Sequence, residues 1–323
     1  TILPEMLYQQ FGDEEALPRQ YESMKLFVEA EIRTMGKKNL WIGPSLGDWL
    51  AMGKGIAWQA MHNNPVSNAF IVHDLKVISE TAERLGKKAD ADRYRRQLEA
   101  TTEAYIRKFV SKKGIVAKDY QSAYIMALKF VLPEGELREQ VKKNFAANIR
   151  KNGLQTGFFA TEHLLPLLVE AGETELAYDI LLQEGCPGWM YQVKCGATTT
   201  WERWDALKPD GTVNEEKMAG SGDNMVSFNH YAFGSVGEFY YQYILGIRPQ
   251  KPGFAELHFE PYPDRRLGGV SGSYLSRAGK IESSWKYGED GCHITLSTPV
   301  KSEVILPDGK KETVEAGTYQ WLC

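Results

Sequence analysis

Apolar residues follow two different periods along the chain. From residue 1 to about 248 they recur at the spacing of an amphipathic helix, as in residues 22–35 and 65–85. From Phe254 onward, short alternating segments are separated by turn sequences such as LPDGKK, in which Asp308-Gly309 is typical of a hairpin. We therefore predict a mainly α domain over residues 1–248 and a small antiparallel β-sandwich over residues 249–323, joined by GIRPQKPGF.

The helical part is predicted to contain about nine helices. Besides the two ranges above, they are expected near residues 3–11, 88–110, 119–131, 134–151, 161–172, 174–184 and 226–245. The segments AFIVHDLKVI and YAFGSVGEFYYQYIL are apolar or small on most sides, as in helices that are buried on most sides. Paired helices with alternating short and long loops indicate a toroid of inner and outer helices. The long loop from about 186 to 224 is rich in tryptophan, which favours a functional loop over disorder.

Composition narrows the classes of function. A net charge of -4 without a basic stripe gives no indication of a nucleic-acid partner, and the lack of a long apolar run predicts no membrane partner. The four cysteines lack the spacing of metal ligands and no calcium-loop pattern occurs, so neither a metal nor a cofactor is expected. Free thiols are the simplest interpretation, and a Cys186–Cys195 disulfide stays open if the protein is exported. TILPEMLYQQ does not have the pattern of a signal peptide, which leaves the location open.

Three stretches combine aromatic rings with polar groups: SLGDWL, with Asp48 and Trp49; TTTWERWD, with Glu202; and SFNHYAFG, with Asn229 and His230. At one end of a toroid, such loop-to-helix junctions would line a single cavity. Indole rings suit the C–H faces of a sugar, and carboxylate, amide and imidazole groups suit its hydroxyl rim. Hydrolysis of a glycosidic bond also needs a proton donor and a second carboxylate.

Each candidate also has a purely structural interpretation. Asp48 suits the N-cap of the following helix, Trp49 suits a core, and His230 suits a satisfied buried histidine. Glu202 is not expected to pair with its neighbour Arg203, since adjacent residues seldom face each other, but a pair with a more distant cation stays open. Burial between indoles would raise the pKa of Glu202 and a nearby cation would lower it, so its net direction is left open.

GATTTWERWDAL followed by SFNHYAFGSVGEFYYQYILGI resembles the C-terminal half of glycoside hydrolase family 78, the α-L-rhamnosidases. SLGDWL and the segment from TGFFATEHLL to CGATT resemble the same family in order and spacing. The resemblance covers residues 1 to about 260 and continues more weakly to the end. It implies an (α/α)6 toroid followed by a β-sandwich, and an inverting hydrolase that acts on rhamnose-containing glycosides or oligosaccharides.

The resemblance also assigns roles to residues of this chain. Glu202 corresponds to the general base, which activates a water on the face opposite the leaving group. His230 corresponds to a residue that contacts the sugar, and Asp48 and Trp49 match a motif at the sugar pocket. Trp201 and Trp204 would shape the pocket, and Asn229 precedes His230 in the same motif.

One part of the family pattern is missing from the sequence. The family's general acid lies in a segment of the form Asp-x-Pro-x-Arg-Glu, and neither GDEEALPRQYE nor PEM fits it. Nine helices also fall short of the twelve in such a toroid. We therefore expect the chain to lack the first helices of the catalytic domain, with the acid on a missing upstream segment. An open toroid would expose an apolar seam that favours association.

Two alternatives stay open. One is a related toroid glycosidase with a substitute acid, for which Asp48, Glu162 and Asp223 are the candidates. The other is a non-catalytic sugar-binding remnant that kept the aromatic pocket. Cleavage of rhamnosides separates these alternatives from one another.

Overall fold

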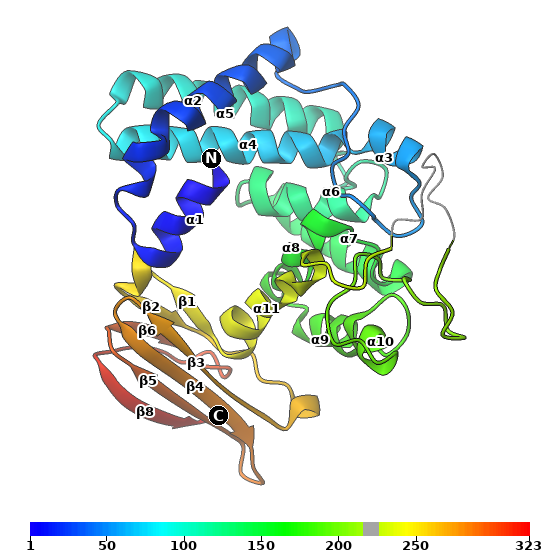
Figure 1. The fold of residues 1–323 in the computed structure, drawn as a ribbon. Coiled ribbons are helices and arrows are strands. Elements are labelled where there is room, and N and C mark those ends of the chain that lie inside the picture. Colours follow the sequence, from blue (N-terminus) through cyan, green and yellow to red (C-terminus); the bar gives the residue numbers. More distant parts are fainter. Residues whose placement is uncertain (216–225) are drawn as a thin grey trace. The chain divides into compact units, whose positions relative to one another are not determined.

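The structure, a computed structural model, describes residues 1–215 and 226–323 (Figure 1). It divides into two compact units. The helical unit comprises Lys25–Val236, and the second unit comprises Thr1–Met24 together with Gly237–Cys323. The divisions fall inside helices α2 (Ala16–Met35) and α11 (Val236–Phe239). Each unit is described separately.

The helical unit is built from hairpins of helices. After α2 and the short η1 (Gly36–Lys38), its elements are α3 (Ile56–His62), α4 (Asn64–Arg84), α5 (Lys88–Phe109), α6 (Gln121–Met126), η2 (Ala127–Val131), α7 (Glu136–Asn152), α8 (Phe158–Glu170), α9 (Thr174–Leu182), α10 (Trp189–Lys194) and η3 (Ala232–Ser235). Helix α4 packs beside α5, α6 beside α7, and α8 beside α9 (Figure 1). Short connections join α4 to α5 and α8 to α9, as expected for antiparallel neighbours, whereas η2 lies between α6 and α7.

Burial separates inner from outer helices. Every residue of α6 is buried, and α4 is buried on most sides. By contrast, α5 buries one stripe, which includes Ala91, Tyr94 and Tyr105, and exposes its charged side chains. A helix that is apolar all round needs neighbours all round, whereas an amphipathic helix covers a core from outside. The prediction that AFIVHDLKVI belongs to an inner helix is therefore confirmed.

The expected helices are mostly found, with three differences. Helices α3 and α10 were not predicted, because both are short and lie in segments without a long apolar period. The helix expected over residues 226–245 begins only at η3, so its first six residues were predicted wrongly. Three of these residues, Ser227, Phe228 and His230, bond instead to residues 199–202, and a local pattern does not reveal such distant partners.

The second unit contains two four-stranded sheets. One has the order β1 (Ile247–Pro249), β2 (Leu257–Phe259), β6 (Ser302–Ile305) and β7 (Lys311–Val314). The other has the order β3 (Gly269–Ser276), β4 (Gly279–Tyr287), β5 (Cys292–Thr298) and β8 (Gly317–Leu322). The remaining elements of this unit are α1 (Ile2–Phe11), η4 (Tyr240–Ile244), η5 (Pro252–Phe254) and η6 (Arg265–Leu267).

Strand pairing confirms the predicted antiparallel sheets with one exception, because β2 pairs with β6 in parallel. The predicted hairpin at Asp308-Gly309 joins β6 to β7. The Asp308 carboxylate accepts a bond from the Lys310 N–H at 2.9 Å, and Gly309 adopts a φ of 87°, which favours glycine. Alternating side chains of β4 and β5, including Ile281, Trp285 and Ile294, fill the core of this unit.

No helix among the described residues is long and apolar enough to cross a membrane.

Candidate functional site

Two segments far apart in sequence pair to form the centre of the site. We call them the site ribbon, residues 199–202 and 227–230. The Glu202 N–H donates to the Ser227 carbonyl at 2.9 Å, and the His230 N–H donates to the Thr200 carbonyl at 2.9 Å. The Thr200 hydroxyl returns a bond to the His230 carbonyl at 2.7 Å. The ribbon therefore brings Glu202 and His230 onto adjacent segments, although 28 residues separate them in sequence.

The two acidic residues of TTTWERWD, Glu202 and Asp205, differ in their surroundings. Arg203 binds Asp205 with two parallel hydrogen bonds of 3.0 Å each, and the Asn214 amide donates to the same carboxylate at 2.9 Å. Within residues 1–215 and 226–323, no side-chain hydrogen bond or ion pair engages the half-buried Glu202 carboxylate. Asp205 thus neutralises the arginine of the motif, whereas the Glu202 carboxylate has no such partner in the part of the chain that the structure describes.

The two indoles of the motif lie inside the protein. Trp204 has no exposed surface, stacks on Phe233 at a centroid distance of 3.8 Å, and donates its N–H to the Thr156 carbonyl at 3.0 Å. Trp201 is 3% exposed and meets the ring of Phe228 edge-on at 5.4 Å. Their faces are covered by protein, so in this arrangement they support the ribbon and do not present a surface to a sugar.

Asp48 is fully buried and bonds the first turn of α8. Its carboxylate accepts from the N–H groups of Gly157 at 2.8 Å, Phe159 at 2.8 Å and Ala160 at 3.0 Å, and from the Ser122 hydroxyl at 2.5 Å. These are amides that a helix cannot satisfy itself. Burial outweighs these four bonds and raises the pKa of Asp48. The expected cap is therefore found on a helix about 110 residues downstream and not on the one that follows Asp48.

The loop that carries Asp48 lies directly against the start of α8. The Phe158 N–H donates to the Trp49 carbonyl at 3.0 Å, and the Trp49 side chain is half-buried. A Cβ atom added at Gly157 would lie 2.1 Å from that carbonyl oxygen. Gly157 is thus needed for the close approach of two backbone segments, which fixes SLGDWL against the helix that begins at Phe158.

His230 links α8 to the ribbon. Its ring lies 4.6 Å from the ring of Phe158, which in turn meets Phe233 at 5.7 Å. The His230 Nδ1 accepts the Ala232 N–H at 3.3 Å, and this bond assigns the proton of a neutral ring to Nε2. The imidazole can therefore offer Nε2–H to an oxygen atom of a ligand. Asn229 is exposed next to it, with its backbone tied to the Ser227 hydroxyl at 3.2 Å.

The structure thus joins the three predicted stretches through one helix start. Phe158 and Phe233 form the contact between them, and neither was predicted as a site residue. Phe158 was missed because α8 was expected to begin at residue 161, although Gly157 signals a break before it. Glu162 is half-buried on α8, whereas Asp223 lies outside the described residues.

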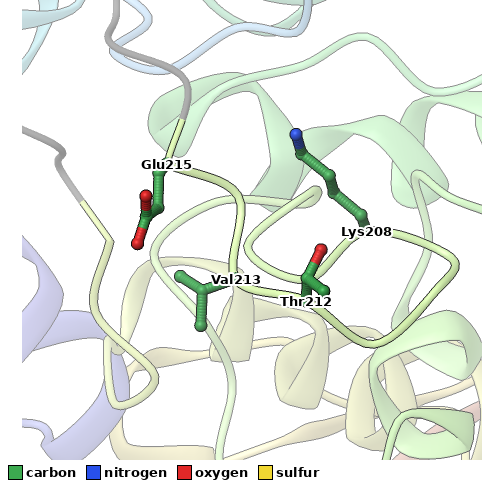
Figure 2. Close-up of a pocket in the computed structure, with 4 residues that line it drawn as sticks. All are labelled: Lys208, Thr212, Val213 and Glu215. Carbon is green, nitrogen blue, oxygen red and sulfur yellow. The ribbon is translucent and has the colours of Figure 1, made fainter.

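An open pocket of about 690 Å³ lies on the hairpin that follows the motif. In this hairpin, Leu207 and Val213 form an isolated antiparallel β-bridge, and the Lys208 N–H donates to the Thr212 carbonyl at 2.8 Å. Figure 2 shows Lys208 on the incoming arm and Thr212, Val213 and Glu215 on the outgoing arm. None of these four lining residues is a predicted site residue. The pocket is therefore adjacent to the motif in sequence but is not formed by Glu202 or His230.

Cys186 and Cys195 are free thiols in the structure. Burial, Asp205 and Cys195 raise the pKa of Cys186 to about 11, so this thiol is a weak nucleophile at neutral pH. Among the described residues, no group of three or more His, Cys, Asp or Glu side chains is arranged to hold a metal ion.

Helical hairpins followed by a unit of two four-stranded sheets are the architecture of the class of six-hairpin glycosidases. Residues 1–244 match the bacterial alpha-L-rhamnosidase 6 hairpin glycosidase domain, and residues 246–320 match the bacterial alpha-L-rhamnosidase C-terminal domain. The chain belongs to this family of alpha-L-rhamnosidases, glycoside hydrolase family 78. The predicted domain boundary near residue 248 stays a prediction.

Sequence similarity to the relatives extends over almost the whole chain. It is 34% identical over 318 residues to an alpha-L-rhamnosidase of Alteromonas sp. (strain LOR), covering 95% of this chain and 34% of the relative. It is 32% identical over 322 residues to an alpha-L-rhamnosidase of Streptomyces avermitilis, covering 98% of this chain and 30% of the relative. The chain therefore spans about a third of the length of these curated relatives.

Two solved structures are similar in fold. The native alfa-L-rhamnosidase from Aspergillus terreus superposes with a TM-score of 0.90 at 29% identity, covering 99% of this chain and 38% of that one. The Streptomyces avermitilis alpha-L-rhamnosidase complexed with L-rhamnose superposes with a TM-score of 0.89 at 29% identity, covering 98% of this chain and 32% of that one.

Proposed function

We propose that this chain carries the general base of an inverting α-L-rhamnosidase, and that Glu202 is that base. The observation that carries the proposal is the half-buried Glu202 carboxylate, unpaired among the described residues and placed on the ribbon beside His230. The family membership and the relative complexed with L-rhamnose support the choice of sugar.

In the proposed reaction, Glu202 removes a proton from a water molecule as the water oxygen attacks the anomeric carbon. The attack comes from the face opposite the leaving group, so the bond to the leaving oxygen breaks as the new C–O bond forms, and the α-linked sugar is released as the β anomer. The base and the acid of an inverting glycosidase stand roughly 6.5–9.5 Å apart, which leaves room for this water.

The other site residues divide into two groups. His230, through Nε2–H, and the exposed Asn229 are proposed to bind sugar hydroxyls, with Trp49 at the edge of the pocket. Asp48, Trp201 and Trp204 were expected at the sugar pocket, but all three are buried, and the Asp48 carboxylate and the Trp204 indole N–H are bonded to protein. We assign them a supporting role, in which Asp48 holds α8 and the indoles hold the ribbon.

The proton donor is proposed to come from outside residues 1–323. Asp48 is a poor substitute acid because its carboxylate has no exposed surface and accepts four hydrogen bonds. The sequence also contains no Asp-x-Pro-x-Arg-Glu segment. A leaving group that departs without protonation depends least on this donor, because general acid catalysis assists the expulsion of basic oxygens.

The test is the cleavage of 4-nitrophenyl α-L-rhamnoside, whose phenolate leaves readily. The first sugar detected by proton NMR should be β-L-rhamnose. Glu202→Gln should lower kcat by roughly 10²-fold or more, while Glu80→Gln, the same change at an exposed position of α4, should not. Full activity of Glu202→Gln, or α-L-rhamnose as the first product, contradicts the proposal. Binding of L-rhamnose without any cleavage by the parent protein favours a sugar-binding remnant instead.

A further inference from the structure

Cys292 and Cys323 lie directly opposite each other on neighbouring segments of the second unit. Strands β5 and β8 pair in antiparallel fashion over residues 293–298 and 317–322, and the pairing continues one step beyond this register. The Cys292 N–H donates to the Cys323 carbonyl at 2.7 Å, and the Cys323 N–H donates to the Cys292 carbonyl at 3.0 Å. The two cysteines therefore form a hydrogen-bonded pair, although residues 293–322 separate them in sequence.

This register sets the separation of the two residues. Opposite residues of a hydrogen-bonded antiparallel pair have Cα atoms about 5.5 Å apart, and disulfides join Cα atoms that are roughly 4.4–6.8 Å apart. Cys292 shares its face of the sheet with the buried Ile294, and Cys323 shares its face with Trp321, which lies opposite Ile294. Both thiols thus leave the sheet on the same face, and a bond between them is compatible with the observed strand pairing.

The electrostatics of the two thiols agree with this placement. Burial, and after it the neighbouring Cys323 thiol, raise the pKa of Cys292, while burial and the Asp308 carboxylate raise the pKa of Cys323. The influence of Cys323 on Cys292 means that the two sulfur atoms are close enough to interact. Because the thiolate is the attacking form, exchange at this pair is slow at neutral pH and faster in mildly alkaline solution.

The two thiols differ in their access to solvent. Cys292 is 3% exposed and lies on β5, which has a neighbouring strand on each side. Cys323 is half-buried and follows β8, which stands at the end of the strand order of its sheet. A small disulfide can reach the sulfur at the edge more easily than the buried one. Cys323 is therefore suited to attack an external disulfide, and Cys292 is suited to complete the exchange.

We propose that Cys292 and Cys323 are a site of reversible thiol–disulfide exchange, at which a small oxidised thiol of the glutathione class closes a cross-strand disulfide. The new bond fastens β8 to β5 and closes a loop over residues 293–322. This site lies in the second unit, and the inference goes beyond the proposed function without depending on it.

The exchange proceeds in two balanced steps. The Cys323 thiolate attacks one sulfur of the small disulfide, whose S–S bond breaks, and the released thiolate takes up a proton. The Cys292 thiolate then attacks the Cys323 sulfur of the mixed disulfide and expels the second small thiol. The protein thiols lose two electrons and two protons, and the small disulfide gains them as it becomes two thiols.

The experiment uses the parent protein and a Cys186→Ser/Cys195→Ser variant, in which only the proposed pair can react. Each is equilibrated with mixtures of reduced and oxidised glutathione at about pH 8.5, then alkylated with N-ethylmaleimide and digested with trypsin. Mass spectrometry should find peptides 287–301 and 312–323 joined by a disulfide. The equilibrium constant for this bond should be at least about tenfold larger in the folded protein than in urea, because strand pairing holds the two thiols together.

Single variants in the same background test the order of attack. Cys292→Ala should leave Cys323 as a mixed disulfide with glutathione, because the second thiol is gone. Cys323→Ser should leave Cys292 reduced, because it is buried. Unchanged near-ultraviolet circular dichroism shows that each variant is folded.

Three results would overturn the proposal. The first is equal equilibrium constants in folded and urea-unfolded protein. The second is a folded protein in which Cys292 and Cys323 both stay alkylated at every ratio of oxidised to reduced glutathione. The third is a folded protein in which each of the two cysteines carries its own glutathione. Modification of Cys292 in the folded Cys323→Ser variant would overturn the order of attack.

Discussion

Asp48 and Glu202 are two carboxylates of the same candidate site with opposite surroundings. Asp48 is fully buried and accepts four hydrogen bonds, three of them from the start of α8. Glu202 is half-buried, and its carboxylate has no hydrogen-bond partner among the described residues. A carboxylate whose acceptor sites are filled by protein stabilises the fold, whereas one with free acceptor sites can take a proton from water. Under the proposed function, this difference assigns Asp48 a supporting role and Glu202 the reacting one.

The largest effect on stability is expected from Asp48→Ala. It leaves three buried amides and a hydroxyl without an acceptor, at a cost of roughly 3 kcal/mol or more in the free energy of unfolding. Glu202→Gln should change the same quantity by less than about 0.5 kcal/mol. Urea denaturation monitored by circular dichroism measures both. Equal losses for the two variants would remove the distinction between the carboxylates.

Gly157→Ala disrupts the contact between the loop that carries Asp48 and the start of α8. The added Cβ would meet the Trp49 carbonyl oxygen at 2.1 Å, so the loop or the helix must shift, at a cost of roughly 1–3 kcal/mol. Gly185→Ala is the control, since nothing lies within 4 Å of a Cβ there. Thermal unfolding of the two variants compares them. An unchanged unfolding temperature for Gly157→Ala would show that the close approach of SLGDWL to α8 does not contribute to stability.

Trp204→Phe tests whether the indole supports the ribbon. It removes the N–H that bonds the buried Thr156 carbonyl, and part of the ring stacked on Phe233, at roughly 1–2 kcal/mol. The affinity for L-rhamnose, measured on the folded variant, should fall only slightly because the ring does not face the ligand. Complete loss of rhamnose binding with unchanged stability would return Trp204 to the sugar contacts.

Acid should weaken the packing of α4 against α8 by a smaller amount. Burial lowers the pKa of His73 to about 4 and that of His163 to about 3, and Lys129 disfavours the charged form of both. Both rings pack on Phe130. Because the unfolded chain binds more protons between these values and about 6.5, the free energy of unfolding should fall as the pH drops from 6.5 toward 4. His163→Gln should make this dependence shallower in denaturation curves at several pH values.

Local patterns in the sequence predicted much of the fold. The apolar period of AFIVHDLKVI predicted an inner helix, and Asp308-Gly309 predicted a hairpin, because both signals are contained in a few neighbouring residues. Residues 226–231 were predicted as helix, since a local sequence pattern does not show that Thr200 and Glu202 bond the backbone of this segment. The parallel pairing of β2 with β6 was missed for the same reason, as strand partners are set by the whole sheet.

The candidate site was predicted from motifs, and its residues stay a prediction. The resemblance grouped Glu202 with His230, and the ribbon brings them together. It also grouped Asp48 and Trp204 with the sugar contacts, yet the partners that bury them, Gly157 and Phe233, come from other segments. The motifs therefore grouped residues that the structure also brings together, while the burial of each side chain depended on segments far away in sequence.

Chemical rescue of Glu202→Ala tests the role of Glu202 most directly. Removing the carboxylate should nearly abolish cleavage of 4-nitrophenyl α-L-rhamnoside, and sodium azide should restore it, because the small anion attacks from the side that the water used. The account predicts β-L-rhamnosyl azide as the product, identified by proton NMR. Formation of the α-linked azide, or no rescue in a folded variant that still binds L-rhamnose, would contradict the assignment of Glu202 as the general base.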